Sequence, residues 1–473
     1  LQKAGFSAYL VGGCVRNLLL DAKPRDWDIT TNAKPEQITS LFAKTFYENE
    51  FGTVTIVSEE TTDETLRNVE VTPFRTETTY SDKRHPDQVK FGDKLEDDLK
   101  RRDFTINALA YNPAQGQLVD LFGGEKDLKD KLIKAVGNPD ERFSEDPLRM
   151  LRAIRLAAEL GFTINSETAQ AIQNKADLIK VVSKERIRDE FSKIILSKNP
   201  MIGLILAHKL SILAHFLPEL EEGVGMKQTK EHKYAVFEHT IRVVQHSADR
   251  DYKFHVRLAA LFHDVGKPRT RAWSPEKGDW TFYGHDIVGA RMTQEILNRL
   301  KFPKKTIEIV VKLVRNHMFF TDIERITLSA VRRIIRNVGP EHIWELMEVR
   351  RCDRTGMGRP KESPYRLRKY ESMIEEALRS PTSVGMLKIT GNDVIRETKL
   401  NPGPKIGHIL HVLLEEVLEK PELNEGAYLI SQAKELAKLE EGELKTLGEK
   451  GKEKKEETEQ AELEKIRSKF HVK

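Results

Sequence analysis

The sequence is poor in cysteine and has no long apolar run. Its 473 residues include only Cys14 and Cys352, which excludes a disulfide framework, and no Cys-x-x-Cys metal pair occurs. No apolar stretch approaches the length that spans a bilayer, and we expect no signal peptide before the first domain. The chain begins at Leu1 without methionine, so we expect a short N-terminal piece to be missing. We predict a cytoplasmic protein with no membrane partner.

Positive and negative side chains are nearly balanced in number. Lysine and arginine number 78 and aspartate and glutamate 74, which gives a net charge of +4 and a pI near 8.7. This balance excludes no partner, because nucleic-acid binding depends on where the positive charges lie rather than on their total. A hydrophobic content of 39%, a charged content of 32% and a mean hydropathy of −0.51 indicate folded domains with a well-solvated surface.

The chain is too long for one hydrophobic core, and its pattern changes after Pro139. Short β-rich runs come first, and we predict strands at Ala8–Val11, Thr53–Val57, Val69–Val71 and Leu118–Leu121. From Asp146 onward, apolar residues recur at helical spacing almost to the end. We therefore predict an α+β protein, with a mixed-sheet head followed by all-helical segments. The expected divisions are 1–138, 139–220, 221–360, 361–435 and a Lys/Glu-rich extension, 436–473, which lacks the apolar surface to fold alone.

Two acidic residues of the head, Asp26 and Asp28, follow the glycine pair Gly12 and Gly13. In a strand the two acids project from one side. Converging carboxylates repel each other unless a cation lies between them, and magnesium favours such oxygen ligands together with substrate phosphates. Glycine lets a backbone approach phosphate closely. The pattern suggests a site for a metal-bound nucleoside triphosphate, although Asp-x-Asp alone is also common in solvated turns.

Further charged residues of the head have two interpretations each. Glu70, in an alternating strand, either supplies a third carboxylate to the metal or faces water. Arg101 and Arg102 are predicted to begin a helix, and paired arginines grip phosphates bidentately. On that helix Asp103 and Asn107 lie one turn apart, placed to address a sugar hydroxyl. The alternative is an ordinary charged helix start.

A predicted helix of the second segment carries an arginine at every third position: Arg149, Arg152 and Arg155. This spacing places them on one face, opposite the apolar residues. Asp146 and Arg149, one turn apart, present an acceptor beside donors, as the edge of a base does. Such a pair is able to choose an incoming base without a nucleic-acid template; the alternative is an intrahelical ion pair worth about 0.3–0.5 kcal/mol. A second amphipathic helix, opening at 185–190, is predicted to brace this one by ion pairing.

These residues form five motifs that occur in the order known from one family. The motifs are Gly12-Gly13-x-Val15-Arg16, Asp26-x-Asp28-x-x-Thr31, Arg101-Arg102-Asp103-x-x-x-Asn107, Glu145-Asp146-x-x-Arg149 and Glu185-Arg186-x-x-x-Glu190. Over roughly residues 5–195 the chain resembles the class II tRNA nucleotidyltransferases, which include the CCA-adding enzymes and their poly(A) polymerase relatives. Any single motif is weak, but five in register are highly specific.

The resemblance implies a fold, an activity and roles for individual residues. It implies a head like that of polymerase β, and addition of CCA to the 3′ end of tRNA from CTP and ATP. The catalytic candidates are Asp26, Asp28 and Glu70, of which the two aspartates would bind two magnesium ions. Asp146 and Arg149 would act as a protein template that pairs with the incoming base. The full nucleotide-binding set is Gly12, Gly13, Arg16, Arg102, Asp103, Asn107, Asp146, Arg149, Arg152 and Arg155.

Three short segments bear on the activity within the family. The glycine motif commonly ends in aspartate but here ends in Asn17, which loses the charge, so we expect no direct metal binding there. Poly(A) polymerases usually carry a basic Gly-Arg-Arg-Phe-like segment where this chain has residues 50–54, which favours tRNA end synthesis. The loop 80–86, with Arg84, resembles the flexible loop that full CCA-adding enzymes use to switch from C to A. Addition of CC only, of A only or of a poly(A) tract remain alternatives.

A second group of metal-binding residue types lies downstream of these motifs. His263 and Asp264 follow an apolar helix, and an adjacent His and Asp chelate one metal only if other ligands come from elsewhere. His239 and Asp353 are candidates to complete the site of His263 and Asp264, and His285 and His317 are candidates for a second metal. Mixed imidazole and carboxylate ligands suit Mn, Ni, Fe or Mg. Over roughly 230–355 their order resembles the HD metal-dependent phosphohydrolases, so hydrolysis of RNA ends or nucleotides is the rival function.

The C-terminal part also resembles bacterial CCA-adding enzymes, at 387–393 and 403–407. Backbone N–H groups at the helix start after Pro404 are predicted to bind an RNA phosphate, alongside the plain interpretation of a capped helix. Proteins read duplex RNA by shape and backbone contacts, so we expect the neck 139–220 and the tail 361–435 to hold tRNA. A catalytically silent RNA-binding protein is a third possibility.

Overall fold

The computed structural model describes residues 1–48, 52–77, 89–229, 233–318, 327–359, 361–378, 385, 387–440, 442–444, 446–447 and 468–469. The chain forms two compact units, Leu1–His317 with Glu348–Pro360 and Met318–Met347 with Lys361–Lys473. Within the described ranges, no helix is both long and apolar enough to cross a membrane. The predicted loop 80–86 with Arg84 lies outside the described residues, as does most of the extension 436–473. The five predicted divisions are finer than these two units and stay predictions.

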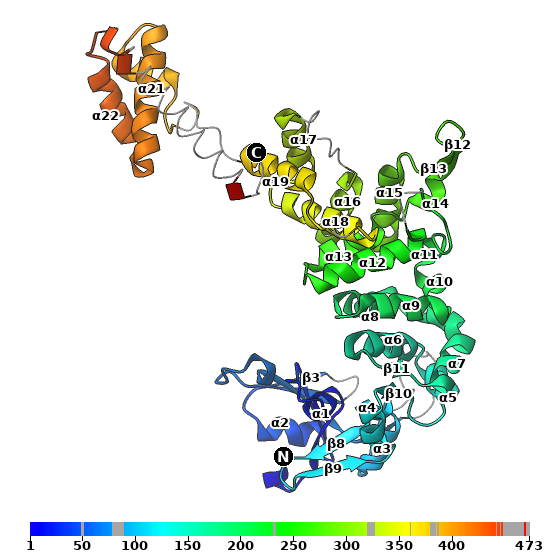
Figure 1. Ribbon diagram of the computed structural model, residues 1–473. Helices are drawn as coiled ribbons and strands as arrows, with labels where there is room; N and C mark the ends of the chain where they lie inside the picture. The colour runs from blue at the N-terminus through cyan, green and yellow to red at the C-terminus, as the bar shows by residue number, and fades with distance from the viewer. Residues whose placement is uncertain are drawn as a thin grey trace. The chain divides into compact units, whose positions relative to one another are not determined.

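The head contains a seven-stranded sheet in the order β3-β4-β5-β2-β1-β8-β9. Its strands are β1 Ala8–Val11, β2 Trp27–Thr31, β3 Thr45–Glu48, β4 Thr53–Val57, β5 Asn68–Pro73, β8 Leu109–Asn112 and β9 Gln117–Asp120. Strands β2 and β5 are parallel, and the other neighbouring pairs are antiparallel. The predicted mixed sheet is confirmed, and each of the four predicted runs overlaps a strand, although Leu121 lies beyond the end of β9. Figure 1 shows these strands in blue and cyan.

Short helices cover the sheet of the head. They are α1 Gly13–Leu19, α2 Pro35–Leu41, α3 Leu95–Lys100 and α4 Gly124–Lys129, beside a separate hairpin of β6 Arg75–Glu77 and β7 Val89–Phe91. Ile38 of α2 is buried against Val54 and Val71 of the sheet. Cys14 of α1 is buried against Leu109 of β8. Both glycine-led α1 and the acid-bearing β2 are thus fixed to the same sheet.

The predicted helix starting at Arg101 is wrong. Helix α3 ends at Lys100, and the chain next forms only a 3-10 turn, η3 Thr105–Asn107. Between them Phe104 makes an isolated bridge with Ala135. The carboxylate of Asp103 accepts a hydrogen bond from the backbone N–H of Phe104 at 2.8 Å. Such a local side-chain bond competes with helix formation, which the charge spacing alone does not reveal.

The neck is a stack of helices with one small exception. Its helices are α5 Pro139–Glu145, α6 Leu148–Leu160, α7 Ser166–Lys175, α8 Lys184–Leu196, α9 Pro200–Lys209, α10 Leu213–Phe216 and α11 Pro218–Glu221. Helix α6 contacts both α8 and α9, so its apolar face is buried. The exception is β11 (Thr163–Ile164), which pairs in parallel with β10 (Leu132–Ile133). A strand of two residues shows no alternation, so the all-helical prediction missed it.

The predicted HD segment contains the helices of the metal-binding candidates. They are α12 Val236–Asp249, α13 Phe254–Phe262, α14 Lys267–Thr270, α15 His285–Arg299, α16 Lys304–Asn316 and α18 Ile343–Gly356. A hairpin of β12 (Ala272–Ser274) and β13 (Asp279–Thr281) interrupts them and is the second exception to the all-helical prediction. Figure 1 shows this hairpin in green.

The second unit is helical where it is described. Its helices are α17 Leu328–Val338, α19 Tyr365–Leu378, α20 Gly391–Thr398, α21 Pro404–Glu419 and α22 Gly426–Leu436. Val394, Leu413 and Leu429 belong to one buried cluster that joins α20, α21 and α22. Helix α21 begins at Pro404 as predicted, and the residue before it, Gly403, offers no side chain to cap the helix.

Candidate functional site

Three acids of the head meet across a parallel strand pair. Asp26 directly precedes β2, and Asp28 of β2 stands in register with Glu70 of β5. Residues in register on neighbouring strands project from the same face of a sheet. Burial, together with the charges of Asp26 and Glu70, raises the pKa of Asp28 to about 6. The carboxylates therefore repel each other, and the arrangement fits a divalent cation.

The glycine pair lies directly beside these acids. Gly12 has φ = +75°, and a Cβ atom there would lie 3.0 Å from Nη1 of Arg102 and 3.5 Å from Oδ2 of Asp28. Any larger residue would be strained and would crowd both side chains. The backbone turn into α1 thus passes between a cation and a carboxylate, as the close approach of a phosphate requires.

A chain of hydrogen bonds connects the glycine turn to the arginine helix α6. Nη1 of Arg16 donates to Oδ1 of Asn107 at 2.7 Å, and Nδ2 of Asn107 donates to Asp103 at 3.1 Å. The other oxygen of Asp103 pairs with Arg152 at 3.0 Å. Burial would raise the pKa of Asp103, but the charges of Arg152 and Arg149, together with the hydrogen bond from Asn107, lower it below its ordinary value. Asn17 accepts from Nη2 of Arg16 at 2.9 Å, so it orients an arginine.

The two arginines at the end of α3 share a buried partner that sequence reasoning missed. The side chain of Asp98 is fully buried and contacts Arg101 at 2.7 Å and Arg102 at 3.1 Å. Burial would raise the pKa of Asp98, but the two guanidinium charges lower it below its ordinary value. The sequence did carry a signal for these contacts, because Asp98 precedes Arg101 by three residues and Arg102 by four.

Asp146 and Arg149 lie close in sequence, but each has a different partner. Asp146 pairs with Arg186 of α8 at 2.8 Å and also accepts from the backbone N–H of Leu148. Arg149 pairs with Glu145 at 2.6 Å and donates to the backbone oxygen of Arg101 at 3.2 Å. The two side chains are therefore fixed by separate partners, Arg186 and Glu145, rather than by the intrahelical pair of the alternative interpretation.

Helix α8 braces α6 as predicted. Besides the Arg186–Asp146 pair, Glu190 of α8 contacts Nε of Arg155 on α6 at 2.8 Å. Both pairs are largely shielded from water, so each holds its arginine in one orientation. The arginine face of α6 is thus tied to the head by Arg152 and to α8 by Arg155.

The six candidate ligands of the HD segment converge in two sets. One set is His239, His263 and Asp353, and the other is Asp264, His285 and His317; within each, ligand atoms lie within 4.8 Å of one another. All six side chains are buried. Asp264 connects the sets: its Oδ2 lies 3.1 Å from Nε2 of His263, and its Oδ1 lies 3.5 Å from Nε2 of His285.

The histidines of this cluster are oriented as metal ligands are. Nδ1 of His263, of His285 and of His317 lies 2.8, 2.7 and 2.6 Å from a backbone carbonyl oxygen. A proton on each Nδ1 leaves a lone pair on Nε2. The Nε2 atoms of His239 and His263 lie 3.2 Å apart, and those of His285 and His317 lie 3.3 Å apart. In the metal-bound state each Nε2 would offer its lone pair to the ion, so the donor set fits cations placed between these atoms.

The pKa values of two histidines in the cluster also indicate a site for a cation. Burial would lower the pKa of His263, but the charges of Asp264 and Asp353 and their hydrogen bonds together raise it to about 10. Burial and the neighbouring charge of His263 lower the pKa of His317 to about 3. Positive charge is therefore favoured at the carboxylates, where a divalent ion would provide it.

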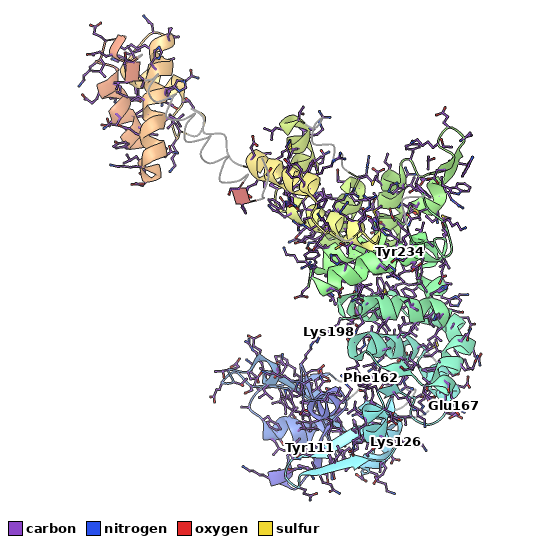
Figure 2. All side chains as sticks on the ribbon, in the orientation of Figure 1. Tyr111, Lys126, Phe162, Glu167, Lys198 and Tyr234 are labelled. Carbon is purple, nitrogen blue, oxygen red and sulfur yellow. The ribbon has the colours of Figure 1, made fainter. Side chains whose placement is uncertain are left out.

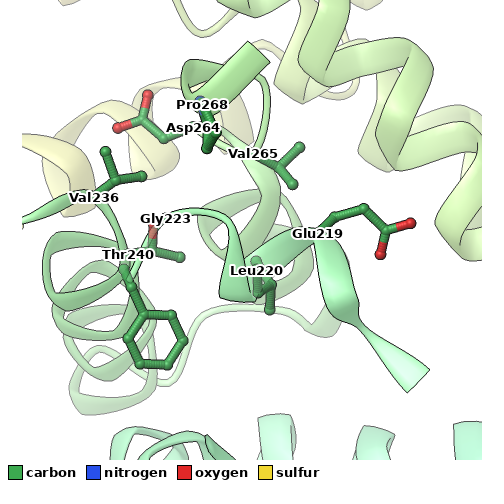
Figure 3. Close-up of a pocket in the computed structure, with 9 residues that line it drawn as sticks. Glu219, Leu220, Gly223, Val236, Thr240, Asp264, Val265 and Pro268 are labelled. Carbon is green, nitrogen blue, oxygen red and sulfur yellow. The ribbon is translucent and has the colours of Figure 1, made fainter. Parts of the chain in front are cut away.

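Two cations beside the cluster were also missed from sequence. Nζ of the buried Lys267 lies 2.6 Å from Asp264, and Arg350 lies 2.5 Å from Asp353. Figure 3 shows a pocket that Asp264 lines with apolar side chains such as Val236 and Val265. Its volume is about 10 Å³, room for one water molecule at most. That pocket is a packing gap beside the cluster rather than a substrate site.

Comparison with known proteins follows this division of the chain. Residues 8–134 match the family model "Poly A polymerase head domain". Residues 161–223 match "Probable RNA and SrmB- binding site of polymerase A", and residues 236–358 match "HD domain".

Individual relatives extend these matches over most of the chain. The chain is 33% identical to a CCA-adding enzyme of Ligilactobacillus salivarius, over 92% of this chain and 94% of that protein. It is 34% identical to an A-adding tRNA nucleotidyltransferase of Deinococcus radiodurans, over 70% and 76%. Relatives that are about 50% identical match over only 47–49% of their own length, so the chain spans about half of them. The crystal structure of the Bacillus stearothermophilus CCA-adding enzyme in complex with CTP superposes with a TM-score of 0.59 at 27% identity, covering 92% of this chain and 94% of that one.

Proposed function

The chain belongs to the family of CCA-adding tRNA nucleotidyltransferases, and from this membership we propose that it adds CCA to the 3′ end of tRNA, using CTP and ATP. The observation that carries the proposal is the meeting of Asp26, Asp28 and Glu70 beside the Gly12 turn. In the reaction, the 3′-hydroxyl oxygen bonds to the α-phosphorus of the nucleotide while the bond to pyrophosphate breaks.

The head provides ligands for metal and for phosphate. Asp26 and Asp28, with Glu70 beside them, would hold Mg²⁺. Two bound Mg²⁺ ions would lower the pKa of the 3′-hydroxyl and neutralise charge on the leaving group. Arg16 and Arg102 flank the glycine turn and are placed to bind the triphosphate, because guanidinium groups bind phosphate oxygens bidentately.

Base selection falls to Asp146 and Arg149. A carboxylate accepts and a guanidinium donates, so together they match the edge of cytosine or adenine. Arg186 and Glu145 orient these two side chains from outside the pair. The proposal needs no nucleic-acid template, because the protein itself supplies the complementary edge.

Replacing Asp26 and Asp28 by alanine tests the head. We expect Asp26→Ala and Asp28→Ala to abolish nucleotide incorporation into tRNA that lacks its end, with unchanged circular dichroism. Asp130→Ala, at another exposed acid of the head, should retain incorporation. Retained incorporation in the Asp28→Ala variant would overturn the proposal.

We infer that the HD segment binds two divalent ions, with Mn, Ni, Fe and Mg as the suitable metals. The facing Nε2 atoms and the bridging position of Asp264 support this inference. Hydrolysis of a phosphodiester or a nucleotide phosphate at these ions is the second candidate function. Asp264→Ala should remove hydrolysis and bound metal while tRNA extension persists. If the variant lost only tRNA extension, the claim that the head and the HD segment carry separate sites would be contradicted.

We propose that the neck 139–220 and the tail 361–435 bind tRNA, with the Pro404 helix start as a candidate phosphate contact. Such binding should weaken as salt rises, because basic side chains displace counterions. A silent RNA-binding protein would show this affinity without extension. The cytoplasmic location stays a prediction.

A further inference from the structure

A pocket of about 400 Å³ opens beside the β12–β13 hairpin, away from the nucleotide site of the head. The described residues 227–229 and 233–235, before α12, form one wall, and the hairpin forms the other. Its lining includes Lys227, Gln228, Lys233 and Tyr234 on one side and Trp273, Asp279 and Trp280 on the other. Figure 2 labels Tyr234, which lies just before α12. The volume suits one nucleotide-sized ligand.

Two tryptophans of the hairpin face each other across the strands. Trp273 and Trp280 are register partners, and their rings lie 5.3 Å apart at 76°. The guanidinium of Arg271 lies 3.6 Å above the Trp280 ring and covers it. Trp273 remains 53% exposed. A large aromatic ring held in place at the mouth of a pocket is a surface on which a base stacks.

The wall opposite the hairpin is basic and aromatic. Lys227 and Lys233 line it, and Asp279 is the acidic residue among the lining. The backbone N–H of Trp280 donates to Asp279 at 2.8 Å, which offsets part of its charge. Arg242 lies 4.1 Å above the Tyr234 ring and fixes that ring. Cations beside aromatic faces favour a ligand that is both flat and anionic.

The pocket is joined to the metal cluster by buried hydrogen bonds. Gln228 lines the pocket and donates to the backbone oxygen of Tyr234 at 3.1 Å. Its Oε1 accepts from Nζ of Lys267 at 2.6 Å, and Lys267 pairs with Asp264. Gln228 and Lys267 are both buried. Lys267 therefore contacts both Gln228 in the pocket wall and Asp264 in the metal cluster.

We propose that this pocket binds a nucleotide, with its base stacked on Trp273 and its phosphate held by Lys227 and Lys233. The nucleotide is either a free nucleoside monophosphate or the terminal unit of a single-stranded RNA, since both present the same base and phosphate. The proposal deepens the HD assignment, because it places a nucleotide beside the cluster, but binding itself requires no metal.

Tryptophan fluorescence in the full chain tests the proposal. Trp27, which adjoins Asp28 in the head, is first replaced by phenylalanine so that head binding does not contribute. Adenosine 5′-monophosphate should then quench fluorescence, with inorganic phosphate giving no quench. Trp273→Ala should weaken the affinity at least tenfold, as loss of a stacking ring does. The matched control is Tyr283→Ala, because Tyr283 is 73% exposed next to the hairpin without lining the pocket.

Two further measurements locate the ligand and separate its sources. Photocrosslinking with 8-azidoadenosine monophosphate should label peptides that contain Tyr234 or Trp273. An oligoadenylate that binds at least tenfold more tightly than the monophosphate would identify an RNA end, and equal affinities would identify the free nucleotide. Unchanged affinity in Trp273→Ala, or an equal quench by inorganic phosphate, would overturn the proposal. The Trp273→Ala variant should still extend tRNA. Failure of the pocket proposal is therefore distinguishable from failure of the head assignment.

Discussion

Single buried carboxylates hold the arginines around the head site. Asp98 holds Arg101 and Arg102, and Asp103 holds Arg152. An arginine fixed in this way loses little conformational entropy when it meets a phosphate, because its orientation is already set. Both acids therefore act on nucleotide binding through these arginines, and Asp103 also belongs to the predicted nucleotide-binding set.

Asp98→Asn should weaken nucleotide binding and lower stability. The amide keeps the size of the side chain but loses the charge, so the hydrogen bonds to two guanidinium groups weaken. We expect KM for CTP to rise about tenfold and the free energy of unfolding to fall by about 2 kcal/mol, the range for charged hydrogen bonds. Steady-state kinetics and urea unfolding measure the two effects. Glu96→Gln, at an exposed residue of the same helix, should change neither.

The stability effect should depend on pH with a defined sign. The folded pKa of Asp98 is held below its ordinary value of 3.8, so its contribution is present above 3.8 and is lost as pH falls through the lowered pKa. The difference between the wild type and Asp98→Asn should therefore be full at pH 7 and should shrink in acid. A difference that grows in acid would contradict the role of the arginines.

Glu70→Gln tests whether this residue is a third carboxylate or a water-facing glutamate. In register with Asp28, its charge contributes to the raised pKa of that residue. Removal should lower Mg²⁺ affinity about 10- to 100-fold, as for groups that tune a metal site. Activity titrated with Mg²⁺ measures this change, with Glu64→Gln as the exposed control. An unchanged Mg²⁺ dependence would favour the water-facing interpretation.

Helices and strands were predictable where the pattern of apolar and charged residues extended over several neighbouring positions. The strands β1, β4 and β5 alternate or run apolar, and α8 begins at the predicted charged segment. The helix expected at Arg101 failed, because Asp103 bonds its own backbone and Phe104 pairs with Ala135. Contacts made only by folding, such as Gln228 with Lys267, left no local signal in the sequence.

Helix α8 should influence which base is chosen, through Arg186. Arg186→Ala frees Asp146 from its partner, so incorporation of UTP or GTP should rise about tenfold relative to CTP and ATP. Stability should fall by about 1–3 kcal/mol, because the change leaves the largely shielded carboxylate of Asp146 without this partner. Arg188→Ala is the control, since Arg188 contacts Asp189 and the backbone of Lys301 instead. Unchanged selectivity in Arg186→Ala would mean that Asp146 needs no support from α8.

At the scale of the whole molecule, the first unit carries two chemically distinct sites. The head presents carboxylates beside a glycine turn, and the HD segment presents buried histidines around Asp264. Each site is built from residues on more than one element. The sequence indicated both sites because these residues occur in the motif order of known families. The sequence assigned His285 and His317 to a second metal, and the fold was required to show that Asp264 also lies with this set.

Removing or adding metal should affect the stability of the HD segment. An ion that binds the folded state alone raises the melting temperature by mass action. Mn²⁺ or Ni²⁺ added after chelation should raise Tm by several degrees, as followed by differential scanning calorimetry. His263→Ala and His317→Ala should each reduce the shift, while His215→Ala, outside the cluster, should leave it unchanged. A full shift in His263→Ala would place the ions elsewhere.

The most direct test of the central claim is to sequence the product of one reaction. The chain is incubated with tRNA that lacks its 3′ end, together with CTP, ATP and Mg²⁺, and the extended tRNA is sequenced. The account predicts that CCA is added and that extension then stops. Addition of CC alone, of A alone or of a long A tract would contradict full CCA synthesis and identify the related activity instead, and no extension would contradict the nucleotidyltransferase assignment.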